Sequence, residues 1–204
     1  MYAIDDILRK ITSYMPDADT ALVRRVFEYA DAAHAGQLRQ SGIPYIQHPL
    51  AVADLVATLK LDVTSICAAL LHDVREDAPD RSEDLEQRFG KEVALVVEGV
   101  TKLAQYHFTS RMESQAENFK KMLVAMSKDI RVILVKLCDR LHNMRTLEHL
   151  SRERQIRIAQ ETKEIYAPLA SRLGIFWMKS ELENLCLYYL RPDIYQLIKE
   201  DFDK

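Results

Sequence analysis

Apolar residues recur at intervals of three and four along most of the chain, which is the period of an amphipathic helix. The pattern is clear at residues 4–14, 91–103 and 151–172. The run from Ile130 to Leu137 is apolar on nearly all sides, and its length and continuation favour a central buried helix over a strand. Only five glycines and six prolines interrupt 204 residues. The chain is therefore predicted to be almost entirely helical.

The composition is that of one folded domain. With 48% hydrophobic residues, the chain can bury a sizeable core. No repeat, low-complexity tract or linker precedes Pro192, so we expect a single domain over residues 1–192. Residues 193–204 then start a charged helix that leads onward.

The net charge and the cysteines indicate which partners and which cellular compartment to expect. The net charge of -3 argues against a broad nucleic-acid-binding surface, and we expect no direct nucleic-acid binding. No apolar stretch approaches the roughly 18 residues of a membrane span, and the N-terminus does not resemble a signal peptide. Cys67, Cys138 and Cys186 lie in apolar helical context, as reduced core thiols do. These features predict a cytoplasmic protein.

The most concentrated chemistry follows the apolar run 66–71. On a helix, spacings of three or four would bring His72, Asp73, Glu76 and Asp77 together. Like charges so close destabilise a bare helix, so a divalent cation is expected among them. The alternative is a solvated acidic face that ends before Pro79.

A second candidate lies in the long stretch without helical period, residues 37–49. Pro49 disfavours helical geometry at His48 and favours a helix from Pro49 onward, which makes His48 a backbone-held candidate ligand. Arg39, Ser41 and Tyr45 offer a planar cation, a hydroxyl and an aromatic ring suited to a nucleotide. An ordinary polar connection is the alternative. His34, nearby, is expected to bond a terminal helix carbonyl rather than a metal.

Asp139 is the third candidate metal ligand, because it ends a run of about nine mostly apolar residues. Burying a lone carboxylate costs several kcal/mol unless something compensates. Lys136, Arg140, Asn143 or Arg145 could supply that compensation. A metal shared with the candidates above could supply it too.

Taken together, His48, His72, Asp73 and Asp139 make a mixed nitrogen and oxygen donor set. Such a set suits manganese or iron(II), with zinc or magnesium possible. Glu76 and Asp77 lie one turn further on, where they could orient or deprotonate an attacking water. Alternatively, they only hold the ligands in place.

Several longer segments are more specific than these single residues. They are RQSGIPYIQHP (39–49), ALLHDVRED (69–77), GVTKL (99–103), QAEN (115–118) and KLCDRLHNMRTL (136–147). They resemble the HD-superfamily hydrolase domain of the RelA/SpoT alarmone enzymes, from about residue 20 onward. Residues 167–174 and 181–185 resemble the stretch that leads into a synthetase domain in the long bifunctional type. No synthetase sequence is present, so residues 193–204 are expected to begin the connection to that missing domain.

The resemblance implies an all-α HD-superfamily bundle of about ten helices with a central metal site. It also implies removal of the 3′-pyrophosphate from (p)ppGpp, giving GDP or GTP and pyrophosphate, with one Mn²⁺ ion, in stringent-response alarmone turnover. The implied partner is the guanine nucleotide alarmone, and a full-length protein would add a synthetase domain and regulatory partners.

The resemblance also implies a role for each matching residue. By this correspondence, the metal ligands are His48, His72, Asp73 and Asp139, the catalytic pair is Glu76 and Asp77, and the nucleotide is bound by Arg39, Ser41, Tyr45, Asn143 and Thr146. Arg39 would stack on guanine, and Asn143 and Thr146 would hold the ribose or base. The chain departs from the family at Gln40, where lysine is frequent, at Arg75, where an apolar residue is usual, and at Ala78, usually threonine. Loss of a lysine near the phosphates would weaken substrate binding.

Two other functions fit the same residues. One is hydrolysis of another nucleotide phosphate, such as that of NADPH. The other is a regulatory guanine-nucleotide-binding module whose hydrolysis is switched off until a missing part of the protein signals.

Overall fold

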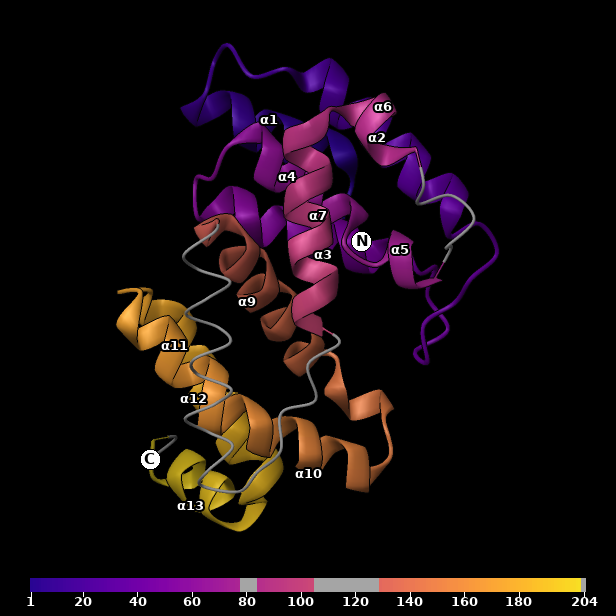
Figure 1. The fold of residues 1–204 in the computed structure, drawn as a ribbon. Helices are drawn as coiled ribbons and strands as arrows, with labels where there is room; N and C mark the ends of the chain where they lie inside the picture. The colour runs from indigo at the N-terminus through magenta and orange to yellow at the C-terminus, as the bar shows by residue number, and fades with distance from the viewer. Residues whose placement is uncertain (78–83, 105–128, 203–204) are drawn as a thin grey trace. The chain divides into compact units, whose positions relative to one another are not determined.

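A computed structural model of the protein describes residues 1–77, 84–104 and 129–202. These residues form helices, turns and one isolated antiparallel bridge between Leu38 and Pro44, and they contain no strand (Figure 1). The all-helical prediction is confirmed. The described residues fall into two compact units, one of residues 1–104 with 129–139 and one of residues 140–202.

The N-terminal unit is built around α4 (Val63–Leu71), whose residues from Ser65 to Leu71 are all buried. α2, α3 and α7 pack against it. The helices of this unit are α1 (Ile4–Tyr14), α2 (Thr20–Ala33), α3 (Gln47–Thr58), α4, α5 (Val74–Asp77), α6 (Leu85–Phe89), α7 (Lys91–Ala104) and the first ten residues of α9 (Ile130–Arg145). The apolar run at residues 130–137 is thus a helix, as predicted.

The start of α4 is fixed by Asp62. Its carboxylate accepts a hydrogen bond from the Ser65 backbone N–H at 2.9 Å, which caps the helix. Its other oxygen accepts one from Arg131 at 2.7 Å, near the beginning of α9. These hydrogen bonds hold the pKa of Asp62 below its ordinary value, although burial opposes the shift. The N-terminal ends of α4 and α9 are therefore tied together.

α3 begins two residues earlier than expected. His48 lies in its first turn, so the prediction that Pro49 would keep His48 out of helical geometry is wrong. The Tyr45 carbonyl accepts a hydrogen bond from the His48 N–H at 2.9 Å. Pro49 has no N–H that would need that carbonyl, so it is tolerated in the first helical turn.

α4 ends at Leu71, so the expected continuous helix through the acidic motif is interrupted. His72 and Asp73 form a turn before α5. The His72 Nδ1–H donates to the Ala69 carbonyl at 2.7 Å. In a continuous helix that carbonyl would accept the N–H of Asp73. The imidazole therefore replaces the next backbone hydrogen bond and helps to end α4.

The C-terminal unit contains the end of α9, η2 (Leu147–His149), α10 (Arg152–Glu161), η3 (Thr162–Tyr166), α11 (Ala167–Arg172), α12 (Phe176–Leu190) and α13 (Pro192–Phe202). The single helix predicted at 151–172 is broken by η3, a π-helical turn. Here the Ala167 N–H bonds the Thr162 carbonyl, five residues back. Pro168 lacks the N–H for a regular bond, and the wide turn accommodates it.

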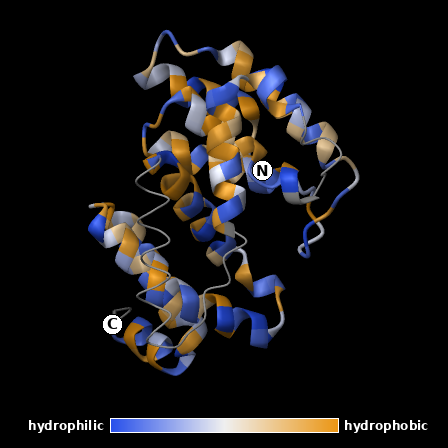
Figure 2. Cartoon of the chain, viewed as in Figure 1, coloured by the Kyte–Doolittle hydropathy of each residue, from blue (hydrophilic) through white to orange (hydrophobic). Residues whose placement is uncertain are grey.

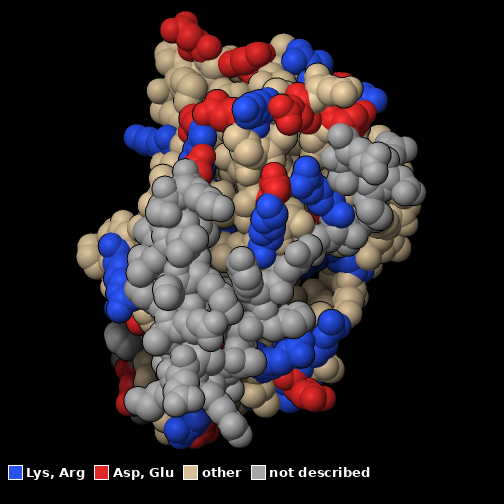
Figure 3. Space-filling model, viewed as in Figure 1, with Lys and Arg blue, Asp and Glu red and all other residues tan. Residues whose placement is uncertain are grey.

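Surface features agree with the sequence pattern. Orange apolar stripes alternate with blue hydrophilic ones around the helices (Figure 2). On the face drawn in Figure 3, acidic and basic side chains of the described residues are interspersed. Among those residues no helix has the length and apolar character to span a membrane. Cys67, Cys138 and Cys186 are buried as reduced thiols, as predicted. The QAEN segment at 115–118 and Ala78 lie outside the described residues.

One close approach joins α7 to α9. A Cβ atom built at Gly99 would lie 2.5 Å from Val132 Cγ2. Gly99→Ala is therefore expected to lower the free energy of unfolding by about 1 kcal/mol, since overpacking costs about 1–3 kcal/mol and alanine's helix propensity returns about 1 kcal/mol. In a Val132→Ala background the same change should stabilise the protein. Urea denaturation of the four proteins measures both effects. A destabilising effect of equal size in both backgrounds would contradict this packing account.

Candidate metal centre

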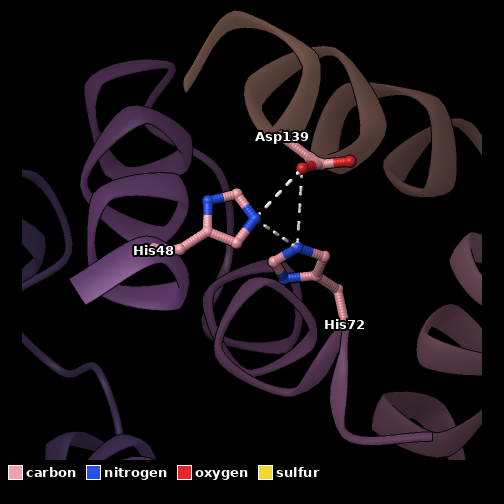
Figure 4. A group of neighbouring side chains, drawn as sticks. All are labelled: His48, His72 and Asp139. Carbon is pink, nitrogen blue, oxygen red and sulfur yellow. Dashed lines mark hydrogen bonds and ion pairs between the residues drawn. The ribbon is translucent and has the colours of Figure 1, made fainter. Parts of the chain in front are cut away.

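Three helices bring three polar side chains to one buried point (Figure 4). His48 comes from the first turn of α3, His72 from the end of α4 and Asp139 from α9. One ligand atom of each lies within 4.8 Å of the others. His48 Nε2 is 3.2 Å from both His72 Nε2 and Asp139 Oδ1, and His72 Nε2 is 3.7 Å from Asp139 Oδ1. At 2%, 2% and 4% exposure, the three residues are almost fully enclosed.

The orientation of His72 is set by its other nitrogen. Because Nδ1–H donates to the Ala69 carbonyl, the neutral ring has its lone pair on Nε2. That atom points at the Nε2 of His48 and toward two carboxylates. A backbone carbonyl behind the ring is the usual arrangement for a metal-binding histidine.

Asp73 stands beside this trio rather than within it. Its Oδ1 is 3.2 Å from His72 Nε2 and its Oδ2 is 3.5 Å from His48 Nε2, so each oxygen faces a different imidazole. Oδ2 also accepts a hydrogen bond from the Tyr45 hydroxyl at 2.8 Å. No single oxygen of Asp73 joins the group of mutually close ligand atoms. The structure thus brings together all four predicted ligands, with Asp73 at the edge.

Asp139 uses its two oxygens for different partners. Oδ1 faces the imidazoles, and Oδ2 accepts from Lys136 Nζ at 2.6 Å. Among the charged residues considered as compensation for Asp139, Lys136 contacts the carboxylate. Arg140 forms an ion pair with Glu161, and Arg145 forms one with Glu181.

The charged groups of the cluster strongly affect one another's pKa values. Burial would raise the pKa of Asp139, but the Lys136 charge and the adjacent imidazoles of His48 and His72 hold it well below its ordinary value. Burial also opposes ionisation of Asp73, yet the charges of His72 and His48 lower its pKa. Both carboxylates are therefore ionised at neutral pH.

The pKa values of the two imidazoles shift in opposite directions. Burial lowers the pKa of His48. For His72 the effect of burial is outweighed by the charges of Asp73 and Asp139 and by hydrogen bonds, and its pKa rises to about 9. The site therefore favours one additional positive charge between two carboxylates.

A divalent cation fits this arrangement. Ligand atoms about 2.1 Å from one ion are about 3 Å apart when they meet at right angles. The distances among the ligand atoms of His48, His72 and Asp139 are 3.2, 3.2 and 3.7 Å. With neutral imidazoles, two carboxylates and one lysine leave a net negative charge. The donors are imidazole nitrogens and carboxylate oxygens, which suit manganese, iron(II) or zinc.

The other predicted site residues lie in three places. Arg39, Ser41 and Tyr45 occupy the loop before α3, and the Arg39 guanidinium carbon is 5.8 Å from the Tyr45 ring centroid. Asn143 follows Asp139 by one turn on α9. Thr146 precedes η2, and its hydroxyl donates to the His142 carbonyl at 3.1 Å.

The predicted catalytic residues Glu76 and Asp77 belong to α5, and their side chains lie outside the described part of the structure. Gln40 is exposed, and Arg75 is partly buried on α5. Sequence reasoning missed the Tyr45–Asp73 hydrogen bond, because it joins residues 28 positions apart in two irregular segments.

Comparisons with known proteins identify the family. Residues 26–176 match the family model described as an HD domain. The match covers more than half of the chain, so the chain belongs to the HD domain family.

Three relatives are identical to this chain at about half of the aligned positions. It is 52% identical over 200 residues to the bifunctional (p)ppGpp synthase/hydrolase SpoT of Escherichia coli strain K12, matching 98% of this chain and 28% of that protein. It is 51% identical over 197 residues to a GTP pyrophosphokinase of Myxococcus xanthus, matching 95% of this chain and 26% of the relative. A probable guanosine-3′,5′-bis(diphosphate) 3′-pyrophosphohydrolase of Synechocystis sp. is 56% identical over 182 residues, 89% of this chain and 24% of the relative. The chain thus spans about a quarter of the length of these relatives.

A solved structure adds support for the fold. It is described as that of a metazoan ortholog of SpoT that hydrolyses ppGpp. The two chains are 27% identical, with a TM-score of 0.61, and the match covers 86% of this chain and 97% of the other.

The cluster predicts stabilisation by a metal. Mn²⁺ at one hundred times its dissociation constant should raise the free energy of unfolding by about 2.7 kcal/mol. Asp139→Asn, which removes an anionic donor at constant shape, should abolish most of that gain. Denaturation with and without Mn²⁺ measures it, with Glu86→Gln as a control because Glu86 is an exposed carboxylate on α6. Equal stabilisation of Asp139→Asn and the unmodified protein would place the ion elsewhere.

Proposed function

We propose that this chain is a metal-dependent phosphohydrolase that removes the 3′-pyrophosphate of (p)ppGpp, releasing GDP or GTP and pyrophosphate. The observation that carries the proposal is the convergence of His48 Nε2, His72 Nε2 and Asp139 Oδ1 within 4.8 Å. The names of the relatives support the substrate. We propose one Mn²⁺ ion, since the donors include no thiolate, and a role in stringent-response alarmone turnover.

His48, His72 and Asp139, with Asp73 beside them, would hold the ion. When bound, a divalent metal draws charge from phosphoryl oxygens and makes water a stronger acid. The hydrogen bond from His72 Nδ1–H to Ala69 keeps Nε2 directed into the site. Lys136 offsets part of the charge of Asp139. These side chains keep the site preorganised, so little rearrangement is needed during the reaction.

Glu76 and Asp77 are the proposed catalytic pair. They follow Asp73 by three and four residues, on the short helix α5. A carboxylate in this region would orient the attacking water and accept its proton. The water oxygen would bond to the phosphorus attached to the ribose 3′-oxygen as the bond between these two atoms breaks. The 3′-oxygen would take up a proton and become the 3′-hydroxyl of GDP or GTP, and the transferred group would leave as pyrophosphate.

By the family correspondence, the nucleotide would be bound by Arg39, Ser41, Tyr45, Asn143 and Thr146. Arg39 offers a planar cation to stack on guanine, and Ser41 a hydroxyl for the nucleotide. Tyr45 would line the pocket, and Asn143 and Thr146 would hold the ribose or base. Gln40 is exposed where related sequences often have lysine, so phosphate binding at that point relies on other groups.

The proposal includes a longer protein. We propose that residues 1–192 form the hydrolase domain and that residues 193–204 lead toward a synthetase domain. The bifunctional name of the Escherichia coli relative, and the quarter of its length that is matched, support this arrangement.

Hydrolysis tests the proposal directly. The purified chain with Mn²⁺ should convert ppGpp to GDP and pyrophosphate, and EDTA should stop the reaction. Glu76→Gln and Asp77→Asn should each lower kcat by about 100-fold or more, because proton transfer by a positioned side chain contributes 10²–10⁴-fold. Glu86→Gln on α6 is the matched control and should retain full activity.

A substrate panel separates the remaining possibilities. Faster hydrolysis of NADPH than of ppGpp at equal concentration would contradict the assigned substrate. Tight ppGpp binding with bound Mn²⁺ and no turnover would instead indicate a regulatory nucleotide-binding module. Full activity in the presence of EDTA would contradict a metal-dependent reaction.

A further inference from the structure

Tyr45 links the loop before α3 to the metal centre. Its hydroxyl donates to Asp73 Oδ2 at 2.8 Å. Its ring lies edge-on to the His48 ring, with centroids 6.2 Å apart and planes at 85°. Tyr45 therefore contacts two of the proposed metal ligands, one through a hydrogen bond and one through its ring.

Tyr45 is itself firmly held. Its N–H donates to the Gln37 carbonyl at 3.0 Å, and its carbonyl accepts from the His48 N–H at 2.9 Å. The imidazole of His34 stacks on the phenol ring, with centroids 4.6 Å apart and planes at 25°. His34 is only 3% exposed, and its Nδ1 is 2.8 Å from the Gln37 Oε1 atom. His34, Gln37 and Tyr45 thus form a closed set of contacts.

Asp73 needs such support more than the other ligands do. It lies in the turn between α4 and α5, outside regular helix. Its two oxygens face different imidazoles, so rotation of the carboxylate would change which oxygen meets which ring. The Tyr45 hydroxyl fixes Oδ2 and leaves Oδ1 toward His72.

The two oxygens of Asp139 also have different partners. Lys136 holds its Oδ2, and its Oδ1 faces the imidazoles. In both carboxylates one oxygen accepts a hydrogen bond from a donor beside the cluster, and the other oxygen faces an imidazole. Oδ2 of Asp73, which Tyr45 holds, also lies 3.5 Å from His48 Nε2. The donor is a cation for Asp139 and a neutral phenol for Asp73.

We propose that Tyr45 is a positioning residue for the metal ligand Asp73, and that His34 acts on the site by holding the Tyr45 ring. This inference rests on the proposed metal-dependent function, and it gives Tyr45 a role beyond lining the nucleotide pocket. Neither residue needs to contact the substrate for this role. The expected consequence is a change in metal affinity in the absence of nucleotide.

Tyr45→Phe tests the role because it removes the hydroxyl and keeps the ring stacked on His34. Loss of a hydrogen bond behind a metal ligand typically costs 10–100-fold in metal affinity. The Mn²⁺ dissociation constant of the nucleotide-free chain, measured by electron paramagnetic resonance of free Mn²⁺, should rise about tenfold. Tyr29→Phe is the matched control, since the Tyr29 hydroxyl donates to Asp84 Oδ1 at 3.1 Å away from the cluster. Its affinity for Mn²⁺ should equal that of the unmodified chain.

A double-mutant cycle tests the part of His34. His34→Ala should weaken Mn²⁺ binding in the unmodified chain and have less than a twofold effect in the Tyr45→Phe background, because it acts through the hydroxyl. Equal effects in both backgrounds would overturn the assignment of His34. Thermal denaturation of each variant identifies a general loss of folding, which would lower stability without this dependence on Tyr45.

Kinetics separate positioning from nucleotide contact. For Tyr45→Phe, the Mn²⁺ concentration that gives half-maximal ppGpp hydrolysis should rise about tenfold, in step with the Mn²⁺ dissociation constant of the nucleotide-free chain. An unchanged Mn²⁺ affinity with a raised KM would overturn the inference and leave Tyr45 as a substrate contact. If the unmodified chain binds Mn²⁺ without cleaving ppGpp, the proposed function fails, and the predicted loss of affinity in Tyr45→Phe still supports the positioning role. Absence of Mn²⁺ binding by the unmodified chain would overturn both.

Discussion

Two ionised carboxylates beside two buried imidazoles form the constraint around which the N-terminal unit is built. Burying an ionised carboxylate costs several kcal/mol unless cations and hydrogen bonds replace its water. Asp139 is 4% exposed and obtains that replacement from Lys136 and from His48. The local negative charge that remains is what a divalent cation would neutralise. The charged cluster therefore accounts for the polar side chains in this core and for the proposed binding of a metal there.

The helix ends at the cluster follow from this requirement. α3 starts where the Tyr45 carbonyl binds the His48 N–H, which places that imidazole in the first turn. α4 stops where His72 bonds the Ala69 carbonyl, which turns Nε2 toward His48. α9 passes the site as a continuous helix and supplies Asp139. Each proposed ligand is fixed by backbone geometry or by a neighbouring donor.

Much of the fold could be predicted from periodicity. The apolar run at 130–137 predicted α9, and the buried run at 66–71 predicted the core helix α4. The helix boundaries were less predictable, because they depend on individual hydrogen bonds. The imidazole of His72 ends α4, and the missing N–H of Pro168 accompanies the π-helical turn η3. The spacing of apolar residues alone carries no information about such contacts.

Part of the candidate site could likewise be predicted from the sequence, and part could not. The burial problem at Asp139 could be recognised from the sequence, because a charged residue followed a long apolar run. The grouping with His48 and His72 needed either the family resemblance or the structure, since the three lie on separate helices. The support from Tyr45 and His34 could not be predicted, because Tyr45 meets Asp73 across 28 residues.

Anomalous scattering from crystals grown with Mn²⁺, recorded at the manganese absorption edge, tests the central claim most directly. The account predicts one strong peak within coordination distance of His48 Nε2, His72 Nε2 and Asp139 Oδ1. A map with no peak between these atoms at saturating Mn²⁺, or with peaks only at surface carboxylates, would contradict it.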